Sequence, residues 1–377
     1  EYDLVYHSIH LNIDPGVRMI SGSVYSELIA LEDNFSQFSF DLDVGMIVDS
    51  FYLNGGLHDF THSNDEISIS ISPILKGEKI NVEVFYHGDP SKHEQKGFGY
   101  SAQGAGPIAW TLSQPYGAYG WWPCKQQLYD KIDSIDLHIT VPSGNKVGSL
   151  GLLTHVDTLA DSQLVFHWKH RYPVATYLVA VAVSNYYEES HYIQLSDGDS
   201  IYHLDYLYPA YKPAADTLRW QIDGMMRGFD SLFGPYPFRK EKYGHVMFAR
   251  GGGMEHQTMS FMGTLNFDLM AHELGHMWFG DKITCASWQD LWLNEGWATY
   301  SNVLAHELVK GRDSYLEFVR FQKSRVLDED GGSVYAYDTA DRADLFSGRL
   351  RYGKGAMVLQ QLRWTVGDSA FFEGTRN

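Results

Sequence analysis

The sequence predicts an α+β protein of more than one domain, in which a β-rich first half precedes a mostly helical second half. Its 377 residues exceed what one ordinary hydrophobic core organises. Apolar residues alternate with a period of two in the first half, and they recur at helical spacing in the second. A hydrophobic content of 44% is typical of a globular chain with substantial cores.

Three segments of the first half carry the alternating pattern of half-buried antiparallel strands. They are residues 80–86, residues 135–141 and a stretch near the chain start. The residues expected on one face of each strand are Ile80, Val82, Val84 and Tyr86; Ile135, Leu137, Ile139 and Val141; and Val5, Ile9, Leu11 and Ile13. Turn-forming sequences such as Asn54-Gly55-Gly56 separate the strands. Residues 1–187 are therefore predicted to form an antiparallel β-rich domain.

The second half, residues 188–377, changes to helical periodicity. A first helix is expected from Ala214 to Gly234-Pro235, where the glycine and proline stop it. The apolar residues on its buried face are Leu218, Ile222, Met225, Phe229 and Leu232. Further helices are expected over 268–279, 290–309 and 354–365. This half is therefore predicted to be a second domain, in which helices dominate.

Charge and hydropathy exclude some classes of partner. The formal net charge of −18 disfavours a nucleic-acid partner, because phosphate backbones would be repelled. The longest apolar run, Tyr177 to Val183, is too short for a membrane span. Cys124 and Cys285 belong to no CxxC pair and are expected to be buried free thiols. The oligomeric state is left open.

The first residue is Glu1 rather than Met, which favours an exported protein whose signal peptide has been removed. A trimmed chain would begin in the same way, so a cytoplasmic location stays open.

A zinc site is predicted from residues 272–276, which read His-Glu-Leu-Gly-His. On a helix, His272 and His276 lie one turn apart on the same face and can bind one metal ion. Glu273 is rotated by about 100° around the helix, so it can act on a metal-bound water as the catalytic base. Glu295, in the next predicted helix, is the expected third ligand.

The segments HELGHMWFGD (272–281) and WLNEGWATY (292–300) resemble the aminopeptidase N and leukotriene-hydrolase family of zinc metallopeptidases, a gluzincin family. The family places 18 residues between the second histidine and the glutamate, as this chain does. The resemblance implies a saddle-like N-terminal β domain and a thermolysin-like catalytic domain with a small sheet. It also implies that the catalytic domain is incomplete at the end of this chain, since family members continue further.

Three more motifs imply an exopeptidase through the same resemblance. Gly252-Gly253-Met254-Glu255-His256 resembles the family's GxMEN, in which the glutamate binds the substrate's α-amino group; His256 replaces the Asn. The two glycines would let a peptide add as a strand. Gln114, in a TQxE-like segment, would accept a hydrogen bond from the same amino group. Tyr352, in a YxKG-like segment, would donate to the oxyanion.

Together these residues predict a zinc-dependent aminopeptidase with one Zn²⁺ per chain, acting on peptides with a free N-terminus. Glu273 would take a proton from the attacking water and pass it to the leaving amine. Three other readings stay open: epoxide hydrolysis on the same site, a non-catalytic binding module and a thermolysin-type endopeptidase.

Overall fold

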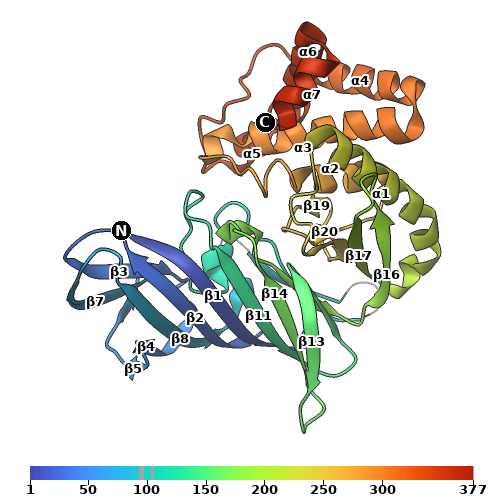
Figure 1. Cartoon of the computed structure of the whole chain (residues 1–377). Coiled ribbons are helices and arrows are strands. Elements are labelled where there is room, and N and C mark those ends of the chain that lie inside the picture. Colours follow the sequence, from blue (N-terminus) through green and yellow to red (C-terminus); the bar gives the residue numbers. More distant parts are fainter. Residues whose placement is uncertain (93–96, 103–105, 377) are drawn as a thin grey trace. The chain divides into compact units, whose positions relative to one another are not determined.

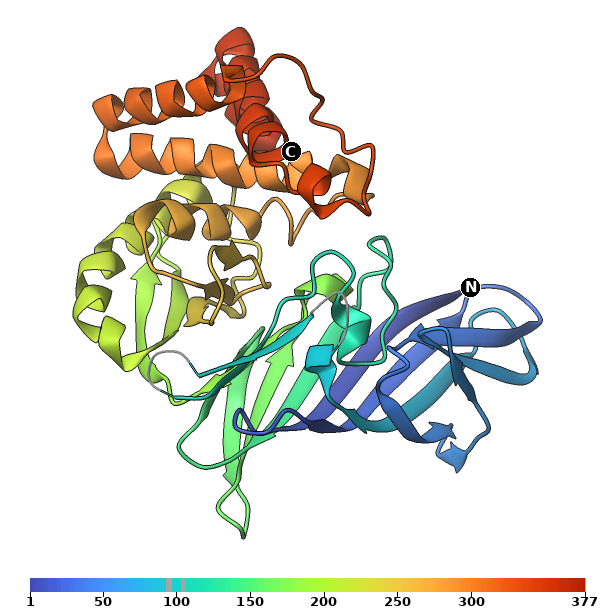
Figure 2. The same ribbon diagram turned by 180° about the vertical axis from the view of Figure 1, so that it is seen from behind.

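The computed structural model describes residues 1–92, 97–102 and 106–376, without the side chains of 214–217, and it divides into two compact units (Figure 1). The first unit holds residues 1–188 with two short segments, 206–210 and 246–249. The second unit holds the rest of the chain. The first is rich in strands and the second in helices, which confirms the predicted fold class (Figure 2).

An eight-stranded sheet forms the main layer of the first unit, in the order β13-β14-β11-β1-β2-β8-β4-β5. Its strands are β1 (Tyr2–Ile13), β2 (Ile20–Ala30), β4 (Ile47–Leu53), β5 (Gly56–Leu57), β8 (Lys79–Gly88), β11 (Ser134–Val141), β13 (Leu152–Thr158) and β14 (Leu164–His170). β1 runs antiparallel to β2 but parallel to β11, so the sheet is mixed rather than purely antiparallel.

Two smaller sheets complete the first unit. One has the order β3-β7-β6, and the other has the order β12-β15-β10-β9. Their strands are β3 (Phe35–Asp41), β6 (Thr61–Ser63), β7 (Glu66–Ile74), β9 (Phe98–Ser101), β10 (Ile108–Thr111), β12 (Lys146–Ser149) and β15 (Val181–Ser184). Short 3₁₀ turns lie at η1 (Pro90–Lys92), η2 (Ala118–Gly120) and η3 (Thr176–Leu178).

The expected inward faces of β8 and β11 are buried, as the alternating pattern predicts. The expectation for β1 is wrong at one residue. Ile9, Leu11 and Ile13 are buried, but Val5 is not, and Leu4 is buried in its place. The register of β1 against β2 shifts between Leu4 and Tyr6. Such a bulge moves every residue before it to the opposite face, so the period-two pattern fails there.

A five-stranded sheet underlies the helices of the second unit, in the order β16-β17-β18-β20-β19. Its strands are β16 (Tyr187–Gln194), β17 (Ser200–Leu207), β18 (Lys242–Met247), β19 (Gly253–Met254) and β20 (Ser260–Met262). The ends of β17 and β18 are counted in the first unit. This is the small sheet that the resemblance implies.

Seven α-helices follow in the described part of the second unit. They are α1 (Lys212–Phe233), α2 (Phe267–His276), α3 (Trp292–Ala305), α4 (Arg312–Leu327), α5 (Arg342–Leu345), α6 (Gly355–Val366) and α7 (Asp368–Arg376). Two π-helical segments, η6 (His306–Lys310) and η7 (Gly348–Lys354), and two 3₁₀ turns, η4 (Pro209–Tyr211) and η5 (Trp288–Asp290), join them. All four predicted helices are present, within a few residues of their expected ends.

Two further expectations concern single features. Cys124 and Cys285 are free and buried, as predicted. In the described part of the chain, no helix is both long enough and apolar enough to cross a membrane.

Candidate zinc site

The two helices that carry the predicted metal ligands pack closely against each other. Asn266 begins α2 by accepting a hydrogen bond from the backbone N–H of Leu269 at 3.0 Å. Gly275, within the motif on α2, faces α3: a Cβ atom there would lie 2.6 Å from the Cβ of Ser301. Only glycine permits this approach, and it brings the histidines of α2 beside Glu295 of α3.

The ligand atoms of His272, His276 and Glu295 converge at one point. Nε2 of His272 lies 3.2 Å from Nε2 of His276. Oε2 of Glu295 lies 3.3 Å from the first nitrogen and 3.4 Å from the second. Zinc binds such atoms at about 2.0–2.1 Å, and tetrahedral angles then separate two ligands by about 3.3 Å. The three residues therefore fit a zinc ion with a fourth position left for water or substrate.

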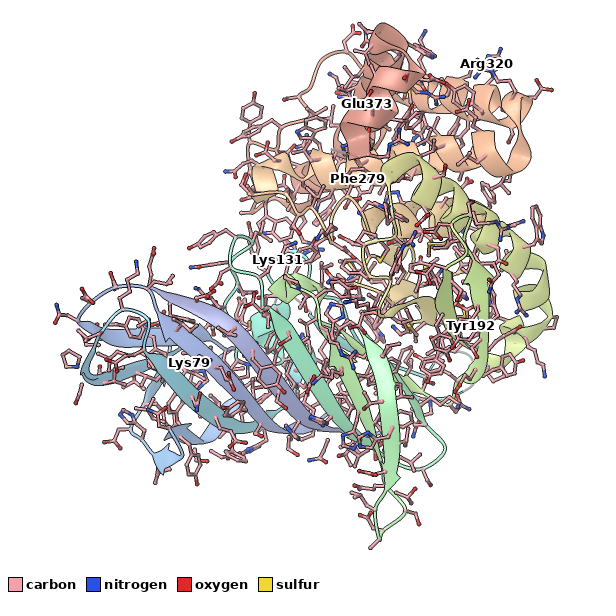
Figure 3. The ribbon with its side chains drawn as sticks, in the orientation of Figure 1. Lys79, Lys131, Tyr192, Phe279, Arg320 and Glu373 are labelled. Carbon is pink, nitrogen blue, oxygen red and sulfur yellow. The ribbon has the colours of Figure 1, made fainter. Side chains whose placement is uncertain are left out.

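Contacts around the ligands fix their protonation. Nδ1 of His276 lies 3.1 Å from the backbone carbonyl oxygen of Phe279, which is labelled in Figure 3. Since a carbonyl only accepts, Nδ1 carries the proton and Nε2 keeps its lone pair for the metal. Burial alone would raise the pKa of Glu295, but contacts with His272 and His276 lower it to about 2. Glu295 is therefore a carboxylate, as a metal ligand must be.

Glu273 lies beside the ligand His276, with its carboxyl group against β19. It is only 3% exposed, and a Cβ atom on Gly253 would lie 2.6 Å from its Cδ and closer still to Oε1. Its other oxygen, Oε2, is buried and has no hydrogen-bond partner within the described residues. Burial is the main cause that raises the pKa of Glu273 well above its usual value, and Glu255 and Glu295 add to it. This carboxyl is therefore poised to hold a proton.

Glu255 follows β19 and belongs to the same cluster. It is 3% exposed, and side-chain atoms of Glu255, Glu273 and His276 lie within 4.8 Å of one another. Gly252, with a φ of +82°, makes the turn before the strand, a conformation that favours glycine. The substitution in the motif, His256, is fully buried with its ring 4.2 Å from that of Phe261, so it fills the core behind β19.

Tyr352 reaches the cluster from η7. Its ring stacks on that of His272, with centroids 5.7 Å apart and planes 14° apart. Burial raises its pKa well above the usual value, so the hydroxyl keeps its proton. Nζ of Lys354, the lysine of the same motif, donates to the carbonyl of Gly332 at 2.6 Å and so ties η7 to the preceding loop.

Sequence reasoning missed the residues that bring these elements together. A Cβ atom on Gly355, at the start of α6, would lie 2.9 Å from the Cα of Gly296 on α3. Two helix backbones therefore meet at this glycine pair, next to Tyr352 and Glu295. Both glycines belong to the motifs quoted above, and this was the one signal in the sequence that could have pointed to them. The spacing of the motifs does not show that the two glycines meet.

Gln114 lies in the first unit, after β10. It is 7% exposed, and a cis peptide bond joins it to Pro115. Trp121 donates through Nε1 to Oγ of the neighbouring Ser113 at 3.0 Å, which fixes this loop within the unit. The part of Gln114 in substrate binding stays a prediction.

Comparison with known proteins identifies relatives of both units. Residues 230–377 match the peptidase family M1 domain. Aminopeptidase N of Streptomyces lividans is 30% identical over 232 residues, which are 54% of this chain and 26% of that protein. A mutant M1 zinc metallopeptidase from Deinococcus radiodurans, bound to a Tyr-Ser-Ala substrate, is 26% identical with a TM-score of 0.85, and the match covers 100% of this chain and 85% of that one.

A more distant structure shares the fold alone. Leukotriene A4 hydrolase from Saccharomyces cerevisiae is 19% identical with a TM-score of 0.79, over 100% of this chain and 61% of that one. The curated relatives are longer proteins: the first matched ones are covered over only 26%, 18% and 14% of their lengths.

The solved relatives of about one-quarter identity are named zinc metallopeptidases. The two imidazoles and one carboxylate that converge in this chain are a ligand set that fits the same metal. The matched segment contains every ligand of the cluster together with Glu255, Glu273 and Tyr352. The match to the peptidase family M1 domain thus spans residues 230–377, and the whole chain shares its fold with the solved M1 zinc metallopeptidases.

Proposed function

We propose that the chain is a zinc aminopeptidase that releases the first residue from peptides with a free N-terminus. The observation that carries the proposal is the buried carboxylate of Glu255 beside Glu273 and His276. A buried carboxylate is the natural partner of an ammonium group, and their charge-assisted hydrogen bond requires an unblocked N-terminus. An endopeptidase has no need for this group next to the metal ligands.

The reaction uses the cluster in a defined order. His272, His276 and Glu295 would hold the zinc ion, which would act as a Lewis acid on the scissile carbonyl and make water a better nucleophile. Oε2 of Glu273, which has no protein partner within the described residues, takes the proton from the attacking water. The same carboxyl then returns that proton to the nitrogen of the departing amine.

Two groups orient the substrate and stabilise the charge that develops. The hydroxyl of Tyr352 keeps its proton because burial raises its pKa, so it donates to the oxyanion as a neutral hydrogen-bond donor. Glu255 holds the α-ammonium group, so that only the first peptide bond reaches Glu273. Gln114 is proposed as a further acceptor for the same ammonium group, in keeping with its TQxE-like segment.

The test compares Glu255→Gln with the parent protein on two substrates. On a free aminoacyl anilide, kcat/KM should fall by about 10- to 100-fold, because the charged hydrogen bond is worth roughly 1.5–3 kcal/mol. On the N-acetylated anilide, any residual hydrolysis should be unchanged. Glu317→Gln, which alters an exposed glutamate on α4, is the matched control and should have no effect.

Zinc content, measured by elemental analysis, separates loss of the metal from loss of substrate binding. Equal loss on the free and acetylated substrates, with zinc retained, would show that Glu255 is not the anchor for the amino group. Full activity of Glu255→Gln on the free substrate would do the same.

A further inference from the structure

Four histidines form a single row across the eight-stranded sheet of the first unit. They come from the neighbouring strands β13, β14, β11 and β1, drawn side by side in Figure 1. His155 pairs with His167, His167 with His138, and His138 with His10 in the strand registers. Directly opposite residues project on the same face within about 5 Å of one another. The row therefore concentrates four imidazoles on the outward side of this sheet.

A β-bulge completes the row at its outer end. The register of β13 against β14 shifts between Leu153 and His155, so Thr154 has no opposite residue and His155 faces His167. Without this bulge, Thr154 would stand opposite His167 and His155 would turn to the other face. The ring of His155 stacks on that of His167, with centroids 3.9 Å apart and planes 11° apart.

Asp157 lies on the same face, two residues after His155. Its Oδ2 is 3.1 Å from Nε2 of His167 and 3.8 Å from Nε2 of His155. These three ligand atoms all lie within 4.8 Å of one another. The side chains of Asp157 and His155 are 60% and 57% exposed, so an ion reaches them directly from solvent.

The Nδ1 atoms of His155 and His167 each have a hydrogen-bond partner, and these partners favour a lone pair on Nε2 of both rings. The hydroxyl of Thr154 donates to the backbone carbonyl of His167 at 2.9 Å. Its oxygen is then left to accept from Nδ1–H of His155 at 3.1 Å, which leaves Nε2 of His155 with its lone pair. Nδ1 of His167 lies 2.6 Å from Nδ1 of His138, and donation in that direction leaves Nε2 of His167 in the same state.

His138 supports the row on the side of His167 away from His155. Its ring lies 4.8 Å from that of His167 and stacks on that of His10, with centroids 4.3 Å apart. A hydrogen bond on the far nitrogen, such as the one between the Nδ1 atoms of His167 and His138, is what orients histidine ligands in metal sites.

We propose that His155, His167 and Asp157 form a second metal site, which binds a divalent first-row transition ion such as Zn²⁺, Ni²⁺ or Cu²⁺. Two imidazole lone pairs and a carboxylate meet there with no hydrogen-bond donor among them, so these electron-rich atoms repel one another. A bound cation removes that repulsion. Imidazole ligands select these ions over Mg²⁺ and Ca²⁺, which prefer oxygen. The inference concerns the first unit and is independent of the proposed peptidase activity.

The experiment titrates Ni²⁺ into the zinc-loaded chain by isothermal calorimetry, with zinc content measured before and after. The parent protein should bind one Ni²⁺ while keeping its catalytic zinc. His155→Gln, His167→Gln and Asp157→Asn should each weaken Ni²⁺ binding by about tenfold or more. Their thermal unfolding and peptidase activity should match those of the parent.

The matched control is His87→Gln. His87 is also a half-exposed histidine on this sheet, and its Nδ1 lies 3.0 Å from Oδ2 of Asp49. Among the described residues, no second imidazole joins this pair to form a group of three possible ligands. This variant should bind Ni²⁺ like the parent. The proposal is overturned if the parent takes up no Ni²⁺ while its zinc is in place. It is equally overturned if both His155→Gln and His167→Gln bind Ni²⁺ as tightly as the parent. The two histidines would then not be ligands, and a shared proton would explain why His155, His167 and Asp157 lie together.

Discussion

Gly253→Ala is the smallest change that should disable the proposed general base without touching the metal ligands. Gly253 belongs to β19, and its Cα faces the carboxyl group of Glu273 on α2. The substitution adds one methyl group at this contact. The three atoms nearest to the new methyl group all belong to Glu273 and none to His272, His276 or Glu295, so zinc should stay bound.

The size of the effect follows from the distance. The added Cβ would lie 2.6 Å from Cδ of Glu273, whereas carbon atoms in contact are about 3.5–4.0 Å apart. Either the strand or the carboxyl must withdraw by roughly 1 Å. A displacement of this size in a reacting group costs about 100-fold in rate, or about 2.7 kcal/mol in activation free energy. We expect kcat to fall by about that factor, with a smaller change in KM.

The assay measures hydrolysis of an aminoacyl anilide together with zinc content and thermal unfolding. Gly251→Ala is the matched control, because a Cβ atom at residue 251 meets no atom of the described residues within 4 Å and the residue is not in the left-handed region. That variant should keep the parent's kcat. The reasoning fails if Gly253→Ala is as active as Gly251→Ala, or if its loss of activity follows loss of zinc.

Three further outcomes are expected. Glu273→Gln should keep zinc but lower turnover by at least about 10²-fold, because the proton acceptor is lost; unaltered turnover would exclude Glu273 as the base. Gly355→Ala should cost about 1–3 kcal/mol in unfolding free energy, because its Cβ would lie 2.9 Å from the Cα of Gly296; an unchanged melting temperature would contradict this. The chain should also lose stability in mild acid, since burial lowers the pKa of three histidines to about 3. These buried histidines are His7, His203 and His256. At these residues the unfolded chain binds protons below about pH 6.5, whereas the folded chain does not. One pH unit below that value, the free energy of unfolding should therefore fall by about 4 kcal/mol. Urea unfolding at several pH values measures this change, and a flat profile would refute it.

Sequence reasoning succeeded where a short, regular repeat decides the geometry. The spacing of His272 and His276 predicts a shared face because one helical turn separates them, and their nitrogens do lie 3.2 Å apart. The buried faces of β8 and β11 follow from strict alternation in the same way. Val5 shows the limit of this reasoning, because a bulge changes the parity of β1 without any signal in its apolar pattern.

The contacts that assemble the site lie beyond such local rules. Gly275 and Ser301 are on different helices, as are Gly296 and Gly355, and each pair meets only through the tertiary fold. A glycine in a sequence predicts freedom of the backbone, but it does not say which element approaches it. The same holds for the histidine row of the first unit, whose members come from four strands and align only through the sheet register.

The glycine contacts link the elements of the candidate site in series. Gly253 joins β19 to Glu273 of α2, Gly275 joins α2 to α3, and the pair Gly296 and Gly355 joins α3 to α6. Along this series lie the residues proposed as substrate anchor, base, metal ligands and oxyanion donor. Ligand separations of 3.2–3.4 Å leave room for shifts of only a few tenths of an ångström before a tetrahedral ion no longer fits. A methyl group at any of these contacts exceeds that tolerance, so the motif glycines set the precision of the site as much as the residues that perform its chemistry.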